Sequence, residues 1–233
     1  MEILFEDNQI IVVKKPQNVP SQEDSSGDKD MLTMVKEYIK EKYNKPGNVY
    51  VGLVHRLDRP TGGVMVFAKT SKAAGRLSDQ IKDGTLEKRY FCVVCGTPRE
   101  KQGRLVHYIK KNERDNIVEI VPQATEGAKR AELEYRVLAT KDKYSLVEVK
   151  LYTGRSHQIR VQMKALGCPV FGDQKYGGEQ MKKANLNLFA VELRFEHPVS
   201  HEKMVFKVYP PEDEQAWKMF NVDQFLRVSK LSD

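Results

Sequence analysis

A continuous apolar run at residues 64–68 (Val-Met-Val-Phe-Ala) constrains the fold more than any other feature of the sequence. The run has the length of a strand and no alternating polar residues, so we expect both of its faces to be buried. Because strand and helix signals alternate without a strict βαβ repeat, the sequence predicts an α+β fold with a mixed, mostly antiparallel central sheet flanked by helices. Strands are expected at residues 10–13, 51–54, 64–68, 88–94 and 147–151, and helices at residues 31–43, 71–81 and 156–166.

Two of these helices are expected to begin at a serine N-cap. Ser71 precedes apolar residues at helical spacing, and Gly84 follows them as a C-terminal stop. Ser156 stands in the same way before the last helix, which Gly167 and Pro169 would end.

The composition of this 233-residue chain, with 40% hydrophobic and 30% charged residues, is that of a globular protein with a sizeable core. The net charge is +7; residues 1–50 and 196–233 each sum to −2, which leaves +11 for residues 51–195. A basic centre is typical of proteins that bind polyanions, and a solvated lysine-rich surface explains it equally well. No apolar run is long enough to span a membrane, and the N-terminus lacks the layout of a secretion signal. Three cysteines are too few for a disulfide framework. We therefore expect a cytoplasmic protein.

The first group of chemically reactive residues is His55-Arg56-Leu57-Asp58-Arg59-Pro60-Thr61-Gly62-Gly63, a turn-rich loop between two apolar strands. Neighbouring cations favour an ionised carboxylate, so Asp58 is expected to be charged at neutral pH and suited to act as a nucleophile or a base. An ordinary Arg–Asp surface pair in a hairpin-like loop is the alternative, which the spacing alone favours.

The second group, Gly154-Arg155-Ser156-His157-Gln158-Ile159-Arg160, lies where a strand passes into a helix. Backbone N–H groups at a helix start, together with two arginines, form an anion site. Arg155 is expected to meet phosphate, whereas Arg160, at the edge of the buried stripe, can reach inward toward an active-site carboxylate. A basic helix start with a solvated face is the alternative.

The third candidate is Tyr90, on a strand in a basic context, which could stack on a nucleobase, although strand tyrosines more commonly fill cores. Cys92 and Cys95 point to opposite faces of the same strand, and no second cysteine pair exists, so no metal site is expected. The sequence also lacks the glycine-rich phosphate-binding motifs, and no cofactor is expected.

Three motifs resemble those of the RluA-type RNA pseudouridine synthases. The family's H-R-L-D-x-x-T-S-G block and the apolar strand after it are similar to HRLDRPTGGVMVFAKT in this chain. Its G-R-[ST]-H-Q-[IL]-R block and G-D-x-x-Y-G turn are similar to GRSHQIRVQMKALGCPVFGDQKYGG. Its opening strand pair, which ends in N-K-P, is similar to ILFEDNQIIVVKKP. The motifs run in family order from residue 3 to residue 178. The resemblance implies a single catalytic domain over residues 1–233, with no separate RNA-binding domain, that isomerises uridine to pseudouridine in RNA without cofactor or metal.

The resemblance also implies roles for individual residues. Asp58 matches the catalytic aspartate, Tyr90 the tyrosine that packs against the target uracil, and Arg160 the arginine that pairs with the aspartate. Arg56 matches an arginine that handles the flipped nucleotide. The other residues expected to contact substrate come from the same two blocks: His55, Arg59, Thr61, Arg155, His157 and Gln158. The expected partner is a stem-loop of ribosomal or transfer RNA, with no membrane, bound by a monomer.

Two positions depart from the family pattern: Gly62 replaces a serine beside the reactive loop, and Lys14 replaces the asparagine of N-K-P. Two other functions remain open. A non-catalytic RNA-binding or RNA-folding protein would keep the basic surface, but the combination of Asp58, Tyr90 and Arg160 argues against it. A hydrolase that releases the base would use two carboxylates, and the two reactive blocks hold only one.

Overall fold

The computed structural model describes residues 1–177, 184–212 and 215–226, so Gly178, which ends the later motif, lies outside the described residues. The chain folds as two compact units. Unit 1 comprises residues 1–88 and 190–208, and unit 2 comprises residues 89–189 and 209–233. The single-domain organisation over residues 1–233 stays a prediction.

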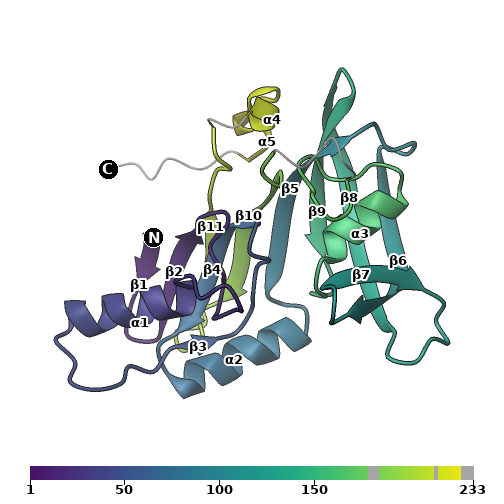
Figure 1. Cartoon of the computed structure of the whole chain (residues 1–233). Coiled ribbons are helices and arrows are strands. Elements are labelled where there is room, and N and C mark those ends of the chain that lie inside the picture. Colours follow the sequence, from purple (N-terminus) through teal and green to yellow (C-terminus); the bar gives the residue numbers. More distant parts are fainter. Residues whose placement is uncertain (178–183, 213–214, 227–233) are drawn as a thin grey trace. The chain divides into compact units, whose positions relative to one another are not determined.

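The sheet of unit 1 is built around the apolar run (Figure 1). Its strand order is β1 (Glu2–Glu6), β2 (Ile10–Lys15), β4 (Gly62–Ala68), β10 (Leu188–Glu196), with β3 (Gly52–Leu53) paired to β4 and β11 (Lys203–Lys207) paired to β10. β2 runs antiparallel to β4, from Ile10 opposite Ala68 to Lys15 opposite Gly63. Residues 64–68 are each exposed by 1% or less, which confirms the expected burial of both strand faces.

Two amphipathic helices complete unit 1. α1 (Met31–Lys42) buries Met31, Val35 and Ile39, and α2 (Ser71–Lys82) buries Ala73 and Leu77. These bounds confirm the two helices expected from apolar spacing.

The cap of α2 differs from the expected one. Thr70, one residue earlier than Ser71, is the N-cap, and its side-chain oxygen accepts a hydrogen bond of 3.1 Å from the backbone N–H of Ala73. Ser71 is the first helical residue, because Thr70 has the extended backbone that an N-cap requires. Gly84, just beyond the helix end, has the left-handed φ of +72° expected of a C-terminal stop.

Unit 2 is built on an antiparallel sheet with the strand order β5 (Glu87–Cys95), β9 (Tyr144–Leu151), β8 (Lys129–Lys141), β6 (Gln102–Asn112), β7 (Ile117–Val121). No element was expected over residues 102–141, where the structure has three strands. The helices of this unit are α3 (Gln158–Ala165), α4 (Gln215–Lys218) and α5 (Asp223–Leu226). Antiparallel pairing with flanking helices confirms the α+β class.

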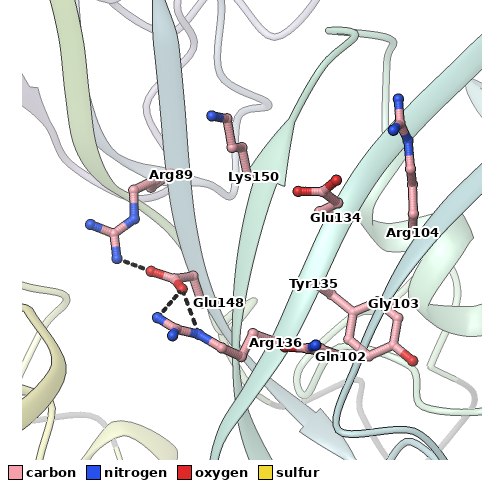
Figure 2. Close-up of a pocket in the computed structure, with 9 residues that line it drawn as sticks. All are labelled: Arg89, Gln102, Gly103, Arg104, Glu134, Tyr135, Arg136, Glu148 and Lys150. Atoms are coloured by element: carbon pink, nitrogen blue, oxygen red, sulfur yellow. Dashed lines mark hydrogen bonds and ion pairs between the residues drawn. The ribbon is translucent and has the colours of Figure 1, made fainter.

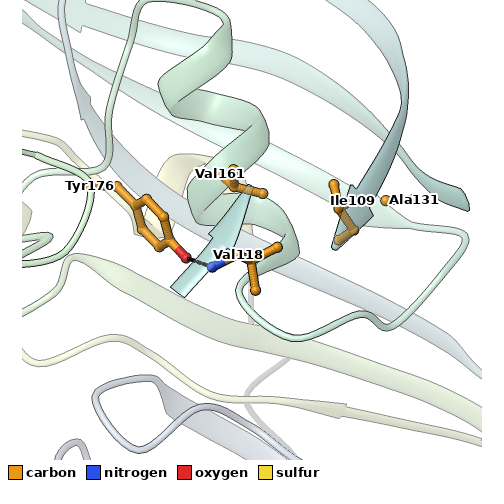
Figure 3. Close-up of a cluster of buried hydrophobic side chains, with 5 residues drawn as sticks. All are labelled: Ile109, Val118, Ala131, Val161 and Tyr176. Carbon is orange, nitrogen blue, oxygen red and sulfur yellow. Dashed lines mark hydrogen bonds between the residues drawn. The ribbon is translucent and has the colours of Figure 1, made fainter. Parts of the chain in front are cut away.

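A small apolar cluster fixes α3 on this sheet. Val161 of α3 and Tyr176 pack with Ile109, Val118 and Ala131, which come from β6, β7 and β8 (Figure 3). The cluster therefore determines where the start of α3, with its arginines, lies within unit 2. None of the helices in the described part of the chain is long and apolar enough to cross a membrane.

Candidate active site

The reactive loop of unit 1 is held on both sides of Asp58 by buried side chains that are distant in sequence. The Ser21 hydroxyl donates to the carbonyl of Leu57 at 2.7 Å and accepts from the Leu57 N–H at 3.1 Å. The ammonium of Lys15 donates to the carbonyl of Arg59 at 3.0 Å. Thr61 N–H closes the turn by donating to the carbonyl of Asp58 at 2.9 Å. The backbone before, at and after Asp58 is thus fixed.

Lys15 is unusual because its side chain is inaccessible to solvent. Burial lowers its pKa from 10.5 to about 7, an effect that the nearby Asp58 carboxylate opposes and the Arg59 cation reinforces. Its second hydrogen bond, of 3.0 Å, goes to the carbonyl of Pro16. Both hydrogen bonds are donated by the amine in either protonation state, so the clamp persists when Lys15 loses its charge.

The other predicted residues of this loop differ in exposure. His55 is buried, and its Nε2 accepts from the N–H of Val66 at 3.1 Å; burial and the Lys88 cation lower its pKa to about 3, so it is neutral. Thr61 is buried, Asp58 is half-buried and Arg56 is exposed. Contacts of His55, Arg56 and Thr61 with substrate stay predictions.

Arg59 takes part in a surface ion pair, but with a different segment from the one expected. Its guanidinium binds Asp24 and Asp28 and donates to the Ser26 hydroxyl at 2.6 Å. This contact ties the segment between β2 and α1, residues 16–30, to the reactive loop. A direct contact of Arg59 with substrate stays a prediction.

In unit 2, Arg160 is buried in a two-pronged ion pair with Asp173. Its Nε and Nη2 atoms each lie 2.8 Å from a different carboxylate oxygen of Asp173. Asp173 also accepts from the backbone N–H groups of Lys175 and Tyr176, both at 3.0 Å. The guanidinium carbon lies 5.1 Å from the centre of the Tyr176 ring. Within unit 2 the buried partner of Arg160 is Asp173, a residue that the sequence did not single out. The expected pairing of Arg160 with Asp58 stays a prediction.

The turn that carries Tyr176 also fixes His157. The Tyr176 hydroxyl accepts from the Val118 N–H at 2.8 Å and lies 2.9 Å from His157 Nδ1. His157 is buried and adopts a left-handed backbone with φ of 50°, which is uncommon outside glycine and asparagine. A strained backbone at a buried residue needs surrounding contacts to maintain it, and the Tyr176 hydroxyl supplies one of them.

Ser156 does not cap α3, which corrects the expectation from sequence. The N-cap position is His157, with no side-chain cap, and α3 begins at Gln158. The amide oxygen of Gln158 instead accepts from the Thr153 hydroxyl at 2.7 Å and from the N–H of Arg155 at 3.0 Å. Gln158 therefore organises the turn before the helix, so Ser156 is not needed as a cap.

Arg155 and Tyr90 occupy different environments. Arg155 is exposed, with its Nε donating to the carbonyl of Arg130 at 3.1 Å. Tyr90 is buried on β5, opposite Val149 of β9. The roles predicted for these two residues, and for His157 and Gln158, stay predictions. Among the described residues, no three His, Cys, Asp or Glu side chains are grouped as metal ligands.

Four residues that hold these segments, each within its own unit, were not singled out by the sequence: Lys15, Ser21, Asp173 and Tyr176. Lys15, Asp173 and Tyr176 lie in the motifs that carry the family resemblance, and their residue types gave no sign that they are buried. Ser21 lies in the stretch of residues 16–30, whose Pro, Ser, Gly and Asp content is typical of a loop and gives no sign of a buried contact. Its contact with Leu57 spans 36 residues, and local sequence patterns carry no information at that separation.

The family model of RNA pseudouridylate synthases matches residues 9–165, more than half of the chain. The chain belongs to the RNA pseudouridylate synthase family. The uncharacterized RNA pseudouridine synthase YhcT of Bacillus subtilis is 33% identical over 91% of this chain and 70% of its own length. The ribosomal large subunit pseudouridine synthase D of Zymomonas mobilis is 32% identical, over 92% of this chain and 71% of its own.

Solved structures of this family have the same fold. Human RNA pseudouridylate synthase domain containing 1 superposes with a TM-score of 0.71 at 26% identity, covering 90% of this chain and 83% of its own. Human RNA pseudouridylate synthase domain containing 4 superposes with a TM-score of 0.77 at 23% identity, covering 97% of this chain and 93% of its own. The RluA-type resemblance and the pseudouridine synthase fold are thereby confirmed, and with them the expectation of an isomerase.

Proposed function

We propose that this pseudouridine synthase isomerises specific uridines in structured RNA, with Asp58 as the catalytic group. The observation that carries the proposal is the clamp on the peptide groups beside Asp58, made by the buried side chains of Ser21 and Lys15. A catalytic group needs such support from residues that are themselves fixed by packing. A loop that served only a surface ion pair would not need it, and Arg59 makes its ion pairs with Asp24 and Asp28.

The proposed reaction breaks the C1′–N1 bond of uridine and joins C1′ to C5, while the proton of C5 is lost and N1 gains one. The target base must leave its stack before these atoms are accessible. Asp58 would attack C1′ or remove the C2′ proton, and Tyr90 would stack on the detached uracil. The pairing of Arg160 with Asp58 that the family motif implies is part of this proposal.

We propose ribosomal RNA of the large subunit as the first target to test, because one of the similar proteins is named for that substrate. A transfer RNA stem-loop remains the other candidate. Three free cysteines fit a reducing compartment, and we propose a monomer acting in the cytoplasm.

Pseudouridine mapping of total RNA, from cells with and without this gene, tests the activity and finds the target at once. One or more sites should disappear with the gene and return with the wild-type protein. Asp58→Asn should not restore them, although the purified variant should keep its affinity for RNA. Restoration by Asp58→Asn would reject Asp58 as the catalytic group, and an unchanged map would favour a non-catalytic RNA-binding role.

A further inference from the structure

One face of the sheet of unit 2 carries a group of arginines that the proposed chemistry does not use. Strand register places Arg104 opposite Glu134, Glu134 opposite Lys150, and Lys150 opposite Arg89, in a row across four strands. Side chains of directly opposed residues lie on the same face of a sheet. We call this surface the arginine face and define it by six residues: Arg89, Arg104, Arg130, Arg136, Lys150 and Tyr152.

The arginine face is opposite to the face that holds Tyr90. Tyr90 pairs with Val149, which pairs with Tyr135, and all three are buried. Successive strand residues point to opposite faces, so Tyr90 and Arg89 belong to different sides of the sheet. Helix α3 packs on the Tyr90 side, where Val161 contacts the cluster of Figure 3. The arginine face is therefore separate from the residues assigned to uracil.

Two shielded glutamates hold the arginines in pairs. Glu148 binds Arg89 and Arg136, with its Oε2 lying 2.7 Å from Arg136 Nη2, and Glu132 binds Arg104 and Arg130. The side chain of Glu148 is only 11% exposed and that of Glu132 only 4%. Each glutamate thus sets one negative charge against the two positive charges of the arginines that it binds. Three of the four arginine side chains, those of Arg104, Arg130 and Arg136, are 57%, 48% and 58% exposed.

An aromatic ring among cations lies beside Glu132 and the arginines that it binds, where the N–H of Tyr152 donates to the carbonyl of Glu132. Tyr152 is 45% exposed, and its hydroxyl donates to Glu134 at 2.8 Å. The Arg104 guanidinium carbon lies 5.2 Å from the ring centre, and Lys150 Nζ lies 5.6 Å from it. An open depression of about 430 Å³ on this surface is lined by Arg89, Arg104, Arg136 and Lys150, among other residues. Figure 2 shows Arg89 and Arg136 converging on Glu148.

We propose that the arginine face binds phosphate groups of the substrate RNA, at a site separate from the nucleotide that is modified. Oriented guanidinium forks match phosphate oxygens, and a ring among cations is the surface on which an unpaired base stacks. Five cations against Glu132, Glu134 and Glu148 give the face a positive excess that complements RNA. The proposal rests on the proposed function, because that function supplies RNA as the partner.

The test removes two exposed arginines without leaving a buried carboxylate unpaired. In Arg104→Gln/Arg136→Gln, Glu132 keeps Arg130 and Glu148 keeps Arg89. The matched control is Lys36→Gln/Lys40→Gln, which removes the same charge from the exposed side of α1. Binding of a fluorescein-labelled RNA hairpin is measured by anisotropy over a range of salt concentrations, beside pseudouridine formation on total RNA from cells lacking the gene.

The arginine variant should bind the hairpin about tenfold more weakly, and its salt dependence should fall by about one unit of slope per lost phosphate contact. Its pseudouridine rate at saturating RNA should match the wild type, and the control should change neither quantity. Unaltered hairpin affinity and salt slope in the arginine variant would overturn the inference, whatever the activity. Absence of pseudouridine with the wild-type protein would instead overturn the proposed function, because hairpin binding does not depend on catalysis.

Discussion

Arg160 and Asp173 form a two-pronged ion pair in which the side chains are exposed by only 5% and 0%. Two buried charges are tolerated only when they are paired with each other and hydrogen-bonded. Here the Asp173 carboxylate also accepts hydrogen bonds from two backbone N–H groups. The pair links α3 to the turn that carries Tyr176. It therefore positions Arg160 for any role that the guanidinium has toward substrate or toward a second carboxylate.

Asp173→Ala should destabilise the protein by about 3–5 kcal/mol, because it leaves the Arg160 guanidinium buried without its partner. The apolar replacement of both groups, Arg160→Met/Asp173→Leu, should be less destabilised than Asp173→Ala alone. Urea unfolding at neutral pH measures both values. A double variant as unstable as Asp173→Ala would show that packing around the pair, rather than an unpaired charge, sets the loss. Neither variant should form pseudouridine, since both disturb Arg160.

The buried amine of Lys15 predicts a pH dependence of stability. The pKa of Lys15 is about 7 in the folded protein, against 10.5 when the amine is solvated, as in the unfolded chain. Below pH 7 the amine is protonated in both the folded and the unfolded protein, so its contribution to the free energy of unfolding does not change with pH. Between pH 7 and 10.5 the unfolded chain binds more protons, and the free energy of unfolding should rise with pH. The rise should be at most about 1.4 kcal/mol per pH unit.

Comparison with Lys15→Met isolates this effect from all other titrating groups. The difference in unfolding free energy between wild type and variant should grow from pH 7 to pH 10.5, as measured by urea unfolding at several pH values. A difference that does not change with pH would mean that Lys15 keeps its ordinary pKa. The variant should also lose activity, because the carbonyl of Arg59 loses its donor beside Asp58.

The sequence predicted the elements whose signals are local and missed those that depend on partners. The run at residues 64–68 and the apolar spacing of α1 were sufficient to place a buried strand and a helix. Strands β6 and β7 were missed because exposed apolar residues such as Val106 and Ile120 obscure their two-residue pattern. β8 does alternate charged residues such as Glu132 and Arg136 with apolar ones, as β9 does, so its strand signal was present in the sequence. In the candidate site, Asp58 and Arg160 were found through motifs. The buried contacts that hold them, from Ser21 and Asp173, arise only when distant segments meet.

Gly63, at the start of the strand that follows the reactive loop, should not tolerate a side chain. Its φ is +132°, and a Cβ there would lie 2.4 Å from the carbonyl oxygen of Ala190 and 2.6 Å from its nitrogen. Backbone atoms of β10 cannot move aside without breaking the sheet. Gly63→Ala should therefore reduce stability by about 3 kcal/mol or more, from strain and overpacking together.

The matched control is Gly75→Ala, which should raise the stability of the protein instead of lowering it. Gly75 lies on the exposed side of α2, where no atom comes within 4 Å of the place that an alanine methyl group would take, and its φ is not positive. Alanine there should stabilise the protein by about 0.5–1 kcal/mol through helix propensity. Thermal unfolding of the two variants beside the wild type measures both shifts, and a stable Gly63→Ala protein would refute the predicted clash with β10.

The hydroxyl of Tyr176 joins β7 to the start of α3, and its removal should affect both. In Tyr176→Phe the ring still packs in the apolar cluster, but the buried Val118 N–H loses its acceptor and His157 loses its neighbour at Nδ1. The unpaired N–H should destabilise the protein by about 1–3 kcal/mol. The exposed Tyr50, changed in the same way to Tyr50→Phe, should leave stability unchanged within about 0.5 kcal/mol. Urea unfolding measures the stability of both variants and of the wild type. If Tyr176→Phe were as stable as Tyr50→Phe, the Tyr176 hydroxyl would contribute nothing to holding His157 in its left-handed conformation.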